Sequence, residues 1–300
     1  MPLNKSGNIQ NFIGCDASYD DAKIVIFGAP FDSTTSNRPG TRFASSVIRL
    51  DSYGLETYSP YQNLDLEDMQ VYDAGELELP FGRPEPALDM IEDAAGQILA
   101  DGKMPLMLGG EHLVTLGSVR AAAKKYPSLH IIHLDAHTDL RENYLGESLS
   151  HATVLRRCHD ILGDGRIFQF GIRSGTREEF EWAKAGHTYL QKFNLDGLAD
   201  AVKSIGDAPV YFTLDLDVLD PSFFPGTGTP EAGGISFMEL LGAILRLREL
   251  NVVGCDVVEL APNFDISGIS TAMACKVIRE LLLAVNNVNR TLNIGGVTNG

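Results

Sequence analysis

The sequence predicts an α/β protein with three layers, in which helices cover both faces of a mainly parallel central sheet of about eight strands. Short apolar runs that end in glycine or in polar residues alternate with longer amphipathic segments along the chain. This alternation is typical of a parallel sheet built from strand–helix–strand units. No linker, low-complexity tract or internal repeat interrupts the series, so residues 1–300 are expected to form a single domain.

Taken in order, the apolar runs give the expected strands, at 23–29, 69–74, 104–109, 129–135, 166–172, 187–190, 210–216 and 252–259. The amphipathic runs give the expected helices, at 87–102, 113–126, 151–162, 176–185, 195–205, 237–250 and 269–285. Ser236 and Glu239 have the spacing of a capping box at the start of the helix at 237. Because ligands of parallel sheets bind beyond the carboxyl ends of the strands, polar residues at those ends are the first functional candidates.

The run HIIHLDAHTD at 130–139 joins an apolar strand to three residues of metal-ligand type. Side chains alternate in an extended chain, so Asp135, His137 and Asp139 point the same way, about 7 Å apart. The alternative is a polar loop that only caps or turns the chain. His133 has the same parity but lies inside the strand, and it is expected to be a hydrogen-bonded core histidine.

A second run, YFTLDLDVLDP, ends in Asp215 and Asp217, and His112 closes a third apolar strand in LMLGGEH. A carboxylate within an apolar strand is costly unless a cation or hydrogen bonds compensate for it. Together with the first run this makes six oxygen and nitrogen ligands and no sulfur. One catalytic zinc takes three protein ligands, so the set favours a pair of harder ions. We therefore expect a binuclear manganese hydrolase.

Other candidates have weaker local signals. Glu259 ends the last strand, where it either holds a substrate cation or pairs with an arginine or a backbone amide. Asp256, in the same strand, is expected to support the site or the core. His151 follows a polar loop and could equally be a helix cap or a surface residue. His159 and His187 have no motif around them and are expected to be structural.

Composition excludes several classes of protein. A formal net charge of −16 argues against nucleic acid or an anionic membrane as partner, and it is compatible with a cationic substrate or simply with solubility. No run approaches the roughly 20 apolar residues of a membrane span, and the first ten residues lack the apolar core of a signal peptide. The cysteines are far apart and are expected to be reduced, buried thiols of a cytoplasmic protein: Cys15, Cys158, Cys255 and Cys275.

Several segments match a known family. They are GGEH, DAHTDL, SHATVLRR, TLDLDVLDPSFFPGTGTPEAGG and VVELAP, with RPGTRF at 38–43 and YSPYQNLDLEDMQVYDAGEL at 58–77. In these segments the chain resembles the ureohydrolases, the family of arginases and agmatinases, and within it the bacterial agmatinases. The resemblance covers nearly the whole chain.

The resemblance implies an arginase-like fold, two Mn²⁺ ions per subunit and a homo-oligomer, either a trimer or a hexamer. It implies hydrolysis of the guanidinium group of agmatine to urea and putrescine, a step of polyamine biosynthesis. His151 would be the proton-transfer histidine, with Asp139 as another proton carrier, and Glu259 would bind the guanidinium group. One ion would take His112, Asp135, Asp139 and Asp215, and the other would take Asp135, His137, Asp215 and Asp217.

Departures from the family pattern bear on the substrate. Ala44, Ser45 and Ser46 replace a Gly-Pro pair that agmatinases often carry, and this change lies away from the metal motifs. The segment after Asp139 lacks the Asn-Thr-Pro run of arginases, which argues against arginine. Guanidinobutyrate, arginine and formiminoglutamate stay open as alternative substrates, because Arg141 and Asn143 are expected near the pocket mouth. A non-catalytic metal-binding protein of the same fold is the alternative from another class.

Overall fold

The computed structural model describes residues 11–286 of the chain, and its centre is one parallel sheet. The strands of this sheet are β1 (Ile24–Ala29), β4 (Val71–Glu76), β5 (Met104–Gly109), β6 (His130–Leu134), β7 (Ile167–Ile172), β8 (Tyr189–Lys192), β9 (Pro209–Asp215) and β10 (Asn251–Val258). Their order is β4-β1-β5-β10-β9-β6-β7-β8, and every neighbouring pair runs parallel. The predicted sheet of about eight strands is confirmed.

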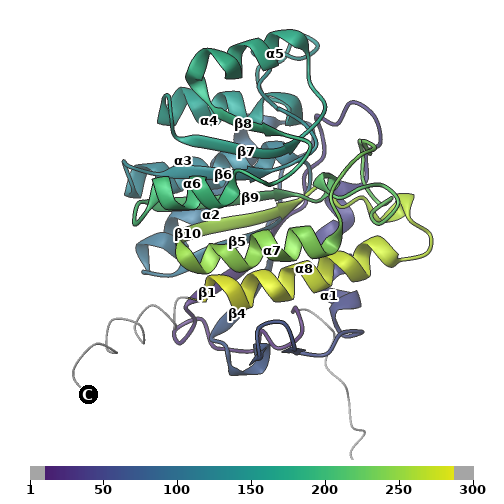
Figure 1. Ribbon diagram of the computed structural model, residues 1–300. Helices are drawn as coiled ribbons and strands as arrows, with labels where there is room; N and C mark the ends of the chain where they lie inside the picture. Colours follow the sequence, from purple (N-terminus) through teal and green to yellow (C-terminus); the bar gives the residue numbers. More distant parts are fainter. Residues whose placement is uncertain (1–10, 287–300) are drawn as a thin grey trace, which may run out of the picture.

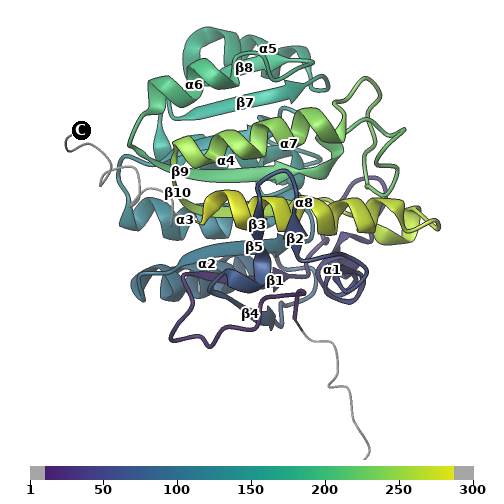
Figure 2. The same ribbon diagram turned by 60° about the horizontal axis from the view of Figure 1, so that its bottom comes forward.

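Helices cover both faces of this sheet (Figures 1 and 2). One face is covered by α1 (Ala44–Ser52), α6 (Leu198–Ile205), α7 (Phe237–Arg246) and α8 (Ile269–Val285). The other is covered by α2 (Pro84–Ala100), α3 (Thr115–Lys125) and α4 (Val154–Leu162), while the short α5 (Arg177–Trp182) lies near β8. The predicted three-layer arrangement is therefore confirmed.

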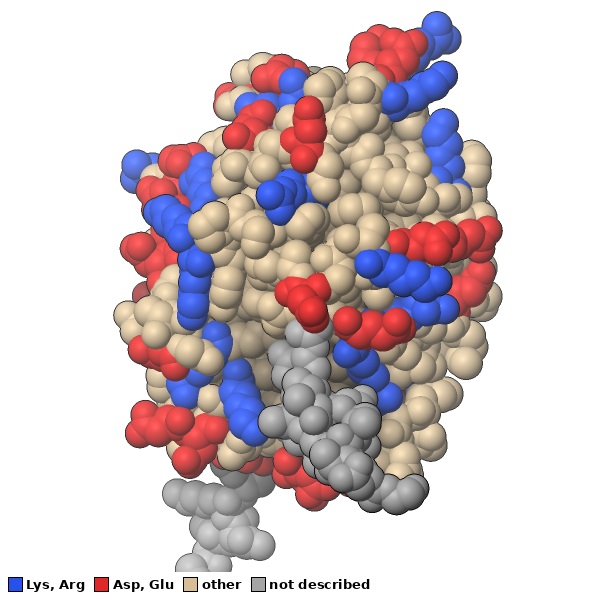
Figure 3. All heavy atoms as spheres, turned by 60° about the vertical axis from the view of Figure 1, so that its left-hand side comes forward, with Lys and Arg blue, Asp and Glu red and all other residues tan. Residues whose placement is uncertain are grey.

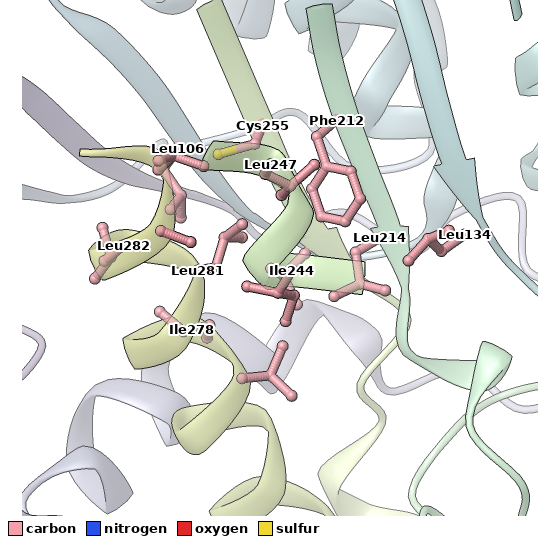
Figure 4. Close-up of a cluster of buried hydrophobic side chains, with 14 of the residues drawn as sticks. Leu106, Leu134, Phe212, Leu214, Ile244, Leu247, Cys255, Ile278, Leu281 and Leu282 are labelled. Atoms are coloured by element: carbon pink, nitrogen blue, oxygen red, sulfur yellow. The ribbon is translucent and has the colours of Figure 1, made fainter. Parts of the chain in front are cut away.

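The core is divided by the sheet into two clusters of buried apolar side chains, one on each face. In the cluster of Figure 4, Leu106 of β5 lies near Leu281 of α8, whereas Phe212 and Leu214 of β9 lie beside Leu247 and Ile244. Burial of each such side chain stabilises the fold by roughly 1.5–3 kcal/mol. The four cysteines are buried and unpaired, as expected. No helix within residues 11–286 is long and apolar enough to cross a membrane.

Some elements differ from those expected. The helix α1 and the two-stranded pair β2 (Tyr58–Ser59) and β3 (Leu64–Asp65) were not predicted. In α1, ASSVIRLDS, only Ala44 and Ile48 are buried apolar residues, so its periodicity is weak and packing against α8 supports it. The expected helix at 176–185 is α5 followed by a π turn at Ala183–His187. The capping box of Ser236 and Glu239 is present.

The fold brings the candidate motifs to one edge of the sheet. The four adjacent strands β5, β10, β9 and β6 end next to His112, Glu259, Asp215 and Asp135 respectively. Parallel strands place their carboxyl ends at the same edge, so segments far apart in sequence meet there. On the face shown in Figure 3, basic side chains lie among acidic ones, and this face offers no continuous basic surface for a phosphate backbone.

Candidate metal centre

Three carboxylates surround one ring nitrogen at the carboxyl edge of the sheet. His112 Nδ1 lies 3.0 Å from Asp135 Oδ2, 3.2 Å from Asp139 Oδ2 and 3.3 Å from Asp215 Oδ2. All four side chains are buried. Three carboxylate oxygens repel one another at this separation unless positive charge lies between them.

The ring of His112 is held so that Nδ1 faces these oxygens. Its Nε2 lies 2.9 Å from Thr213 Oγ1, and that hydroxyl donates to Asp256 Oδ1 at 2.7 Å. The Thr213 hydroxyl donates its single proton to Asp256, so it accepts a hydrogen bond from the Nε2–H of His112. A neutral imidazole carries one N–H proton, which is then on Nε2, so Nδ1 of His112 is bare, without a proton. Nδ1 has no hydrogen-bond partner in the described part of the chain. A bare nitrogen facing carboxylate oxygens is the donor set of a cation site.

The pKa shifts of these residues also indicate a site that needs positive charge. Burial alone would lower the pKa of His112, but the nearby carboxylates of Asp135, Asp139 and Asp215 raise it well above its usual value. Burial raises the pKa of Asp139 to about 7, with repulsion from Asp135 as the next cause. Burial likewise raises the pKa of Asp215 well above its usual value. Positive charge is needed at this point, and a metal ion would supply it in place of protons.

A second group of side chains that could hold a cation lies beside the first. His137 Nδ1 is 3.0 Å from Asp217 Oδ2 and 3.4 Å from Asp135 Oδ1. Asp135 therefore faces His112 through one oxygen and His137 through the other. Asp217 is held in place by Ala136 N, which donates to its Oδ1 at 3.1 Å. Asp135 could therefore be a ligand shared between two cations.

His133 belongs to the support of this cluster. Its Nε2 lies 2.8 Å from Asp135 Oδ2, and its Nδ1 lies 3.1 Å from Gln169 Nε2, which donates to it. Both ring nitrogens are used, and burial lowers the pKa of His133. It is a buried, hydrogen-bonded histidine, as predicted, and it orients Asp135.

His159, Asp164 and His187 form a peripheral group outside the cavity. Both imidazoles donate to Asp164 Oδ1 at 2.7 Å, which is an ordinary hydrogen-bond distance. Trp182 stacks on His187 with ring centroids 4.4 Å apart. These contacts fit the structural role expected for both histidines.

A cavity of about 270 Å³ opens onto the cluster. Glu259 and His151, which are far apart in the sequence, both line this cavity. Glu259 Oε1 accepts a hydrogen bond from His112 N at 2.8 Å, and burial raises the pKa of Glu259 to about 8. His151 Nδ1 lies 2.9 Å from Thr34 O. Burial lowers the pKa of His151 to about 4. Both side chains therefore face the volume next to the cation positions.

Arg141 and Tyr144 also line this cavity. The Arg141 guanidinium lies over the Tyr144 ring at 4.3 Å, and its Nε is 3.5 Å from Glu179 Oε2. Asn143 was expected near the mouth, but it is not among the lining residues, and its Oδ1 instead accepts from Gly146 N within a turn.

Comparison with known proteins identifies the family. A profile of the arginase family matches residues 22–284. The chain belongs to the arginase family. It is 50% identical to the agmatinase of Bacillus anthracis over an alignment of 275 residues, and this alignment covers 91% of this chain and 95% of that protein. It is 33% identical to the guanidinobutyrase of Pseudomonas aeruginosa over 286 residues, 91% of this chain and 90% of that one. The structure of the agmatine ureohydrolase of Thermoplasma volcanium is similar with a TM-score of 0.86 and 33% identity, covering 95% of this chain and 97% of the other.

As an arginase-family hydrolase, the chain carries site residues that sequence reasoning missed. Thr34 and Ser36 come from a loop after β1 and contact His151. Thr213 lies inside β9, one of the apolar runs, where a single threonine carries no signal of function. Glu111 stands inside the GGEH motif, but its partners are in a distant loop. Of these four residues, only Glu111 lies in a sequence motif that indicates a functional site.

Proposed function

We propose that this chain hydrolyses agmatine to urea and putrescine and uses two manganese ions bound at the candidate metal centre. The observation that carries the proposal is the placement of Asp135, whose two oxygens face His112 and His137 separately. The agmatinase of Bacillus anthracis, at 50% identity over most of both chains, supports the choice of substrate.

The residues present fit a pair of divalent ions. The bare Nδ1 of His112 and the surrounding carboxylates supply nitrogen and oxygen donors without sulfur, the donor set that suits manganese. We assign His112, Asp135, Asp139 and Asp215 to one ion and Asp135, His137, Asp215 and Asp217 to the other. When bound, such ions lower the pKa of a shared water toward neutrality and so provide a nucleophile.

Glu259 is assigned to the guanidinium group of the substrate. One of its oxygens is held by His112 N, which leaves the other available to the cavity. A guanidinium group stays protonated and pairs well with a carboxylate. Its arrival would also favour the ionised form of Glu259, whose pKa burial raises to about 8. The carboxylate would thus fix the carbon to be attacked beside the cation positions.

His151 is assigned to proton transfer. With Nδ1–H donating to Thr34 O, the neutral ring presents a bare Nε2. A group of this kind can take a proton and deliver it to the leaving amine. Asp139 is the second candidate carrier, because it too lines the cavity.

The pocket mouth bears on the choice among substrates. The charge of Arg141 is already engaged by Glu179 and by the Tyr144 ring, which disfavours it as a dedicated partner for a carboxylate tail. This favours agmatine over guanidinobutyrate. Guanidinobutyrate is the second candidate, because Arg141 does line the cavity.

The test is urea release by the manganese-loaded protein with equal concentrations of agmatine, arginine and guanidinobutyrate, and formamide release with formiminoglutamate. Strong preference for agmatine is expected. Preference for another substrate would refute the agmatine assignment and keep the hydrolase, whereas no release from any of them would favour the non-catalytic alternative. Asp135→Ala should abolish bound metal and activity together, and finding two ions still bound to this variant would refute the metal assignment.

We also propose that the protein is a cytoplasmic homo-oligomer, a trimer or a hexamer, as the family resemblance implies. Light scattering on the purified protein distinguishes these states from a monomer by mass. A monomeric mass at micromolar concentration would contradict the proposal.

A further inference from the structure

A buried carboxylate ties the loop after β1 to the candidate site. Glu111 follows the glycine pair at the end of β5, and its side chain is fully buried. Its Oε2 accepts a hydrogen bond from Thr34 N at 2.9 Å, and its Oε1 accepts one from Thr34 Oγ1 at 2.7 Å. The backbone of Gly110 packs directly on Phe31, since a Cβ atom at Gly110 would lie 1.9 Å from the Phe31 carbonyl oxygen. Glu111 therefore holds Thr34 in a fixed place.

Thr34 in turn holds His151 at two atoms. Thr34 Oγ1 accepts a hydrogen bond from His151 N at 3.1 Å, and Thr34 O lies 2.9 Å from His151 Nδ1. A carbonyl oxygen only accepts, so Nδ1 carries the ring proton and Nε2 of the neutral ring is bare. Ser36 Oγ lies 3.3 Å from that Nε2. The loop thus determines the position of the ring and its tautomer.

We propose that Glu111 and Thr34 are positioning residues that hold His151 with its bare Nε2 available to the substrate cavity. A hydroxyl has one proton, and Thr34 uses it on Glu111, so its lone pairs face His151 N. Both the N–H and the hydroxyl of Thr34 donate to this one buried side chain, and such directional bonds fix the Thr34 carbonyl as well. This inference rests on the proposed function, in which His151 transfers a proton.

The first test compares Thr34→Val, which removes the hydroxyl at constant shape, with Thr34→Ser, which keeps it. For Thr34→Val we expect kcat for agmatine to fall by about 10- to 100-fold, part of the usual contribution of proton transfer. KM and the bound metal should stay within about twofold of the wild-type values, because Glu259 and the metal ligands are untouched. Thr34→Ser should restore most of the lost rate. Equal rates for the valine and serine variants would overturn the proposal.

A double-mutant cycle separates positioning from simple stabilisation of the fold. If Thr34 acts through His151, then adding Thr34→Val to His151→Ala should lower kcat no further, within about twofold. A loss in the double variant equal to the product of the two single losses would show that Thr34 acts elsewhere, and the proposal would be wrong.

The tautomer of His151 can be measured without any turnover. Side-chain ¹⁵N NMR of the wild-type protein, with the signal assigned by its loss in His151→Ala, should show a neutral ring protonated at Nδ1. Protonation at Nε2 instead would overturn the positioning proposal even in an active enzyme. The expected tautomer in a protein that hydrolyses none of the substrates would support the positioning and refute the proposed function alone.

Discussion

Thr213→Val would remove the support of His112 and leave the candidate ligands themselves unchanged. Thr213 Oγ1 accepts from His112 Nε2 at 2.9 Å and donates to Asp256 Oδ1 at 2.7 Å, and the residue is fully buried. Valine has nearly the same shape, so the change removes a hydroxyl without opening a large cavity. The ring of His112 loses the partner that keeps Nδ1 toward the three carboxylates.

The magnitude follows from the two hydrogen bonds. A buried Nε2–H left without a partner costs roughly 1–3 kcal/mol. Asp256 keeps the bond from Tyr211 Oη at 2.8 Å but loses one charge-assisted bond, worth roughly 1.5–3 kcal/mol. The free energy of unfolding should therefore fall by about 2.5–6 kcal/mol in all. Loss of such a partner typically weakens metal binding about 10- to 100-fold. That factor corresponds to roughly 1.4–2.7 kcal/mol.

Two assays separate these effects. Urea denaturation in the presence of a chelator measures the stability of the metal-free chain, and competition titration with a chelating dye measures manganese affinity. Thr213→Ser is the matched control, because it keeps the hydroxyl and loses only a methyl group. If the valine variant binds manganese as tightly as the serine variant, Thr213 does not orient His112 and the reasoning is wrong.

Three further outcomes are expected. Glu259→Gln should keep the bound metal and lower kcat by about 100-fold or more, since it removes the charge that we assign to binding of the guanidinium group. A near-normal rate in the urea assay would refute this role. Burial lowers the pKa of His151 to about 4, whereas an exposed histidine has a pKa of about 6.5. Between these two pH values the unfolded chain binds a proton at His151 that the folded chain does not bind, so the stability of the fold decreases as the pH falls through this range. His151→Gln should therefore lose less stability than the wild type between pH 7 and pH 5 in denaturant titrations. Gly110→Ala should unfold the protein or destabilise it by more than about 3 kcal/mol in thermal melts, because the new Cβ would overlap Phe31 O. Gly96→Ala in α2 is the control: its Cβ would have no neighbour nearer than 3.9 Å, so it should stabilise the protein by about 1 kcal/mol.

The candidate metal motifs could be recognised because each is local in sequence. Asp135, Asp215 and Glu259 directly follow or end apolar runs, and the rules of parallel sheets bring such ends to one edge. The support of the site could not be predicted in the same way. Thr34 is 77 residues from Glu111 and 117 residues from His151, and nothing in its own neighbourhood indicates either contact. Hydrogen bonds between distant loops depend on the finished fold and leave no periodic signal.

Backbone strain at the site is a second feature that sequence patterns do not reveal. Asp139 and Glu259 both have positive φ, 53° and 66°, in the left-handed region that costs a residue with a side chain roughly 1–2 kcal/mol. At Glu259 this turn is fixed by its own N–H, which donates to Gly110 O at 3.0 Å, and it directs the carboxylate into the cavity.

Comparing Glu259→Gly with Glu259→Ala isolates this strain. Both variants lose the carboxylate and leave His112 N without its partner, and only glycine adopts the left-handed conformation freely. The glycine variant should therefore be about 1 kcal/mol more stable than the alanine variant in urea denaturation, although both should be inactive. Equal stabilities would mean that the conformation at Glu259 carries no strain. A more stable glycine variant would show that the wild-type chain gives up stability at this position to place a charged group beside the metal centre.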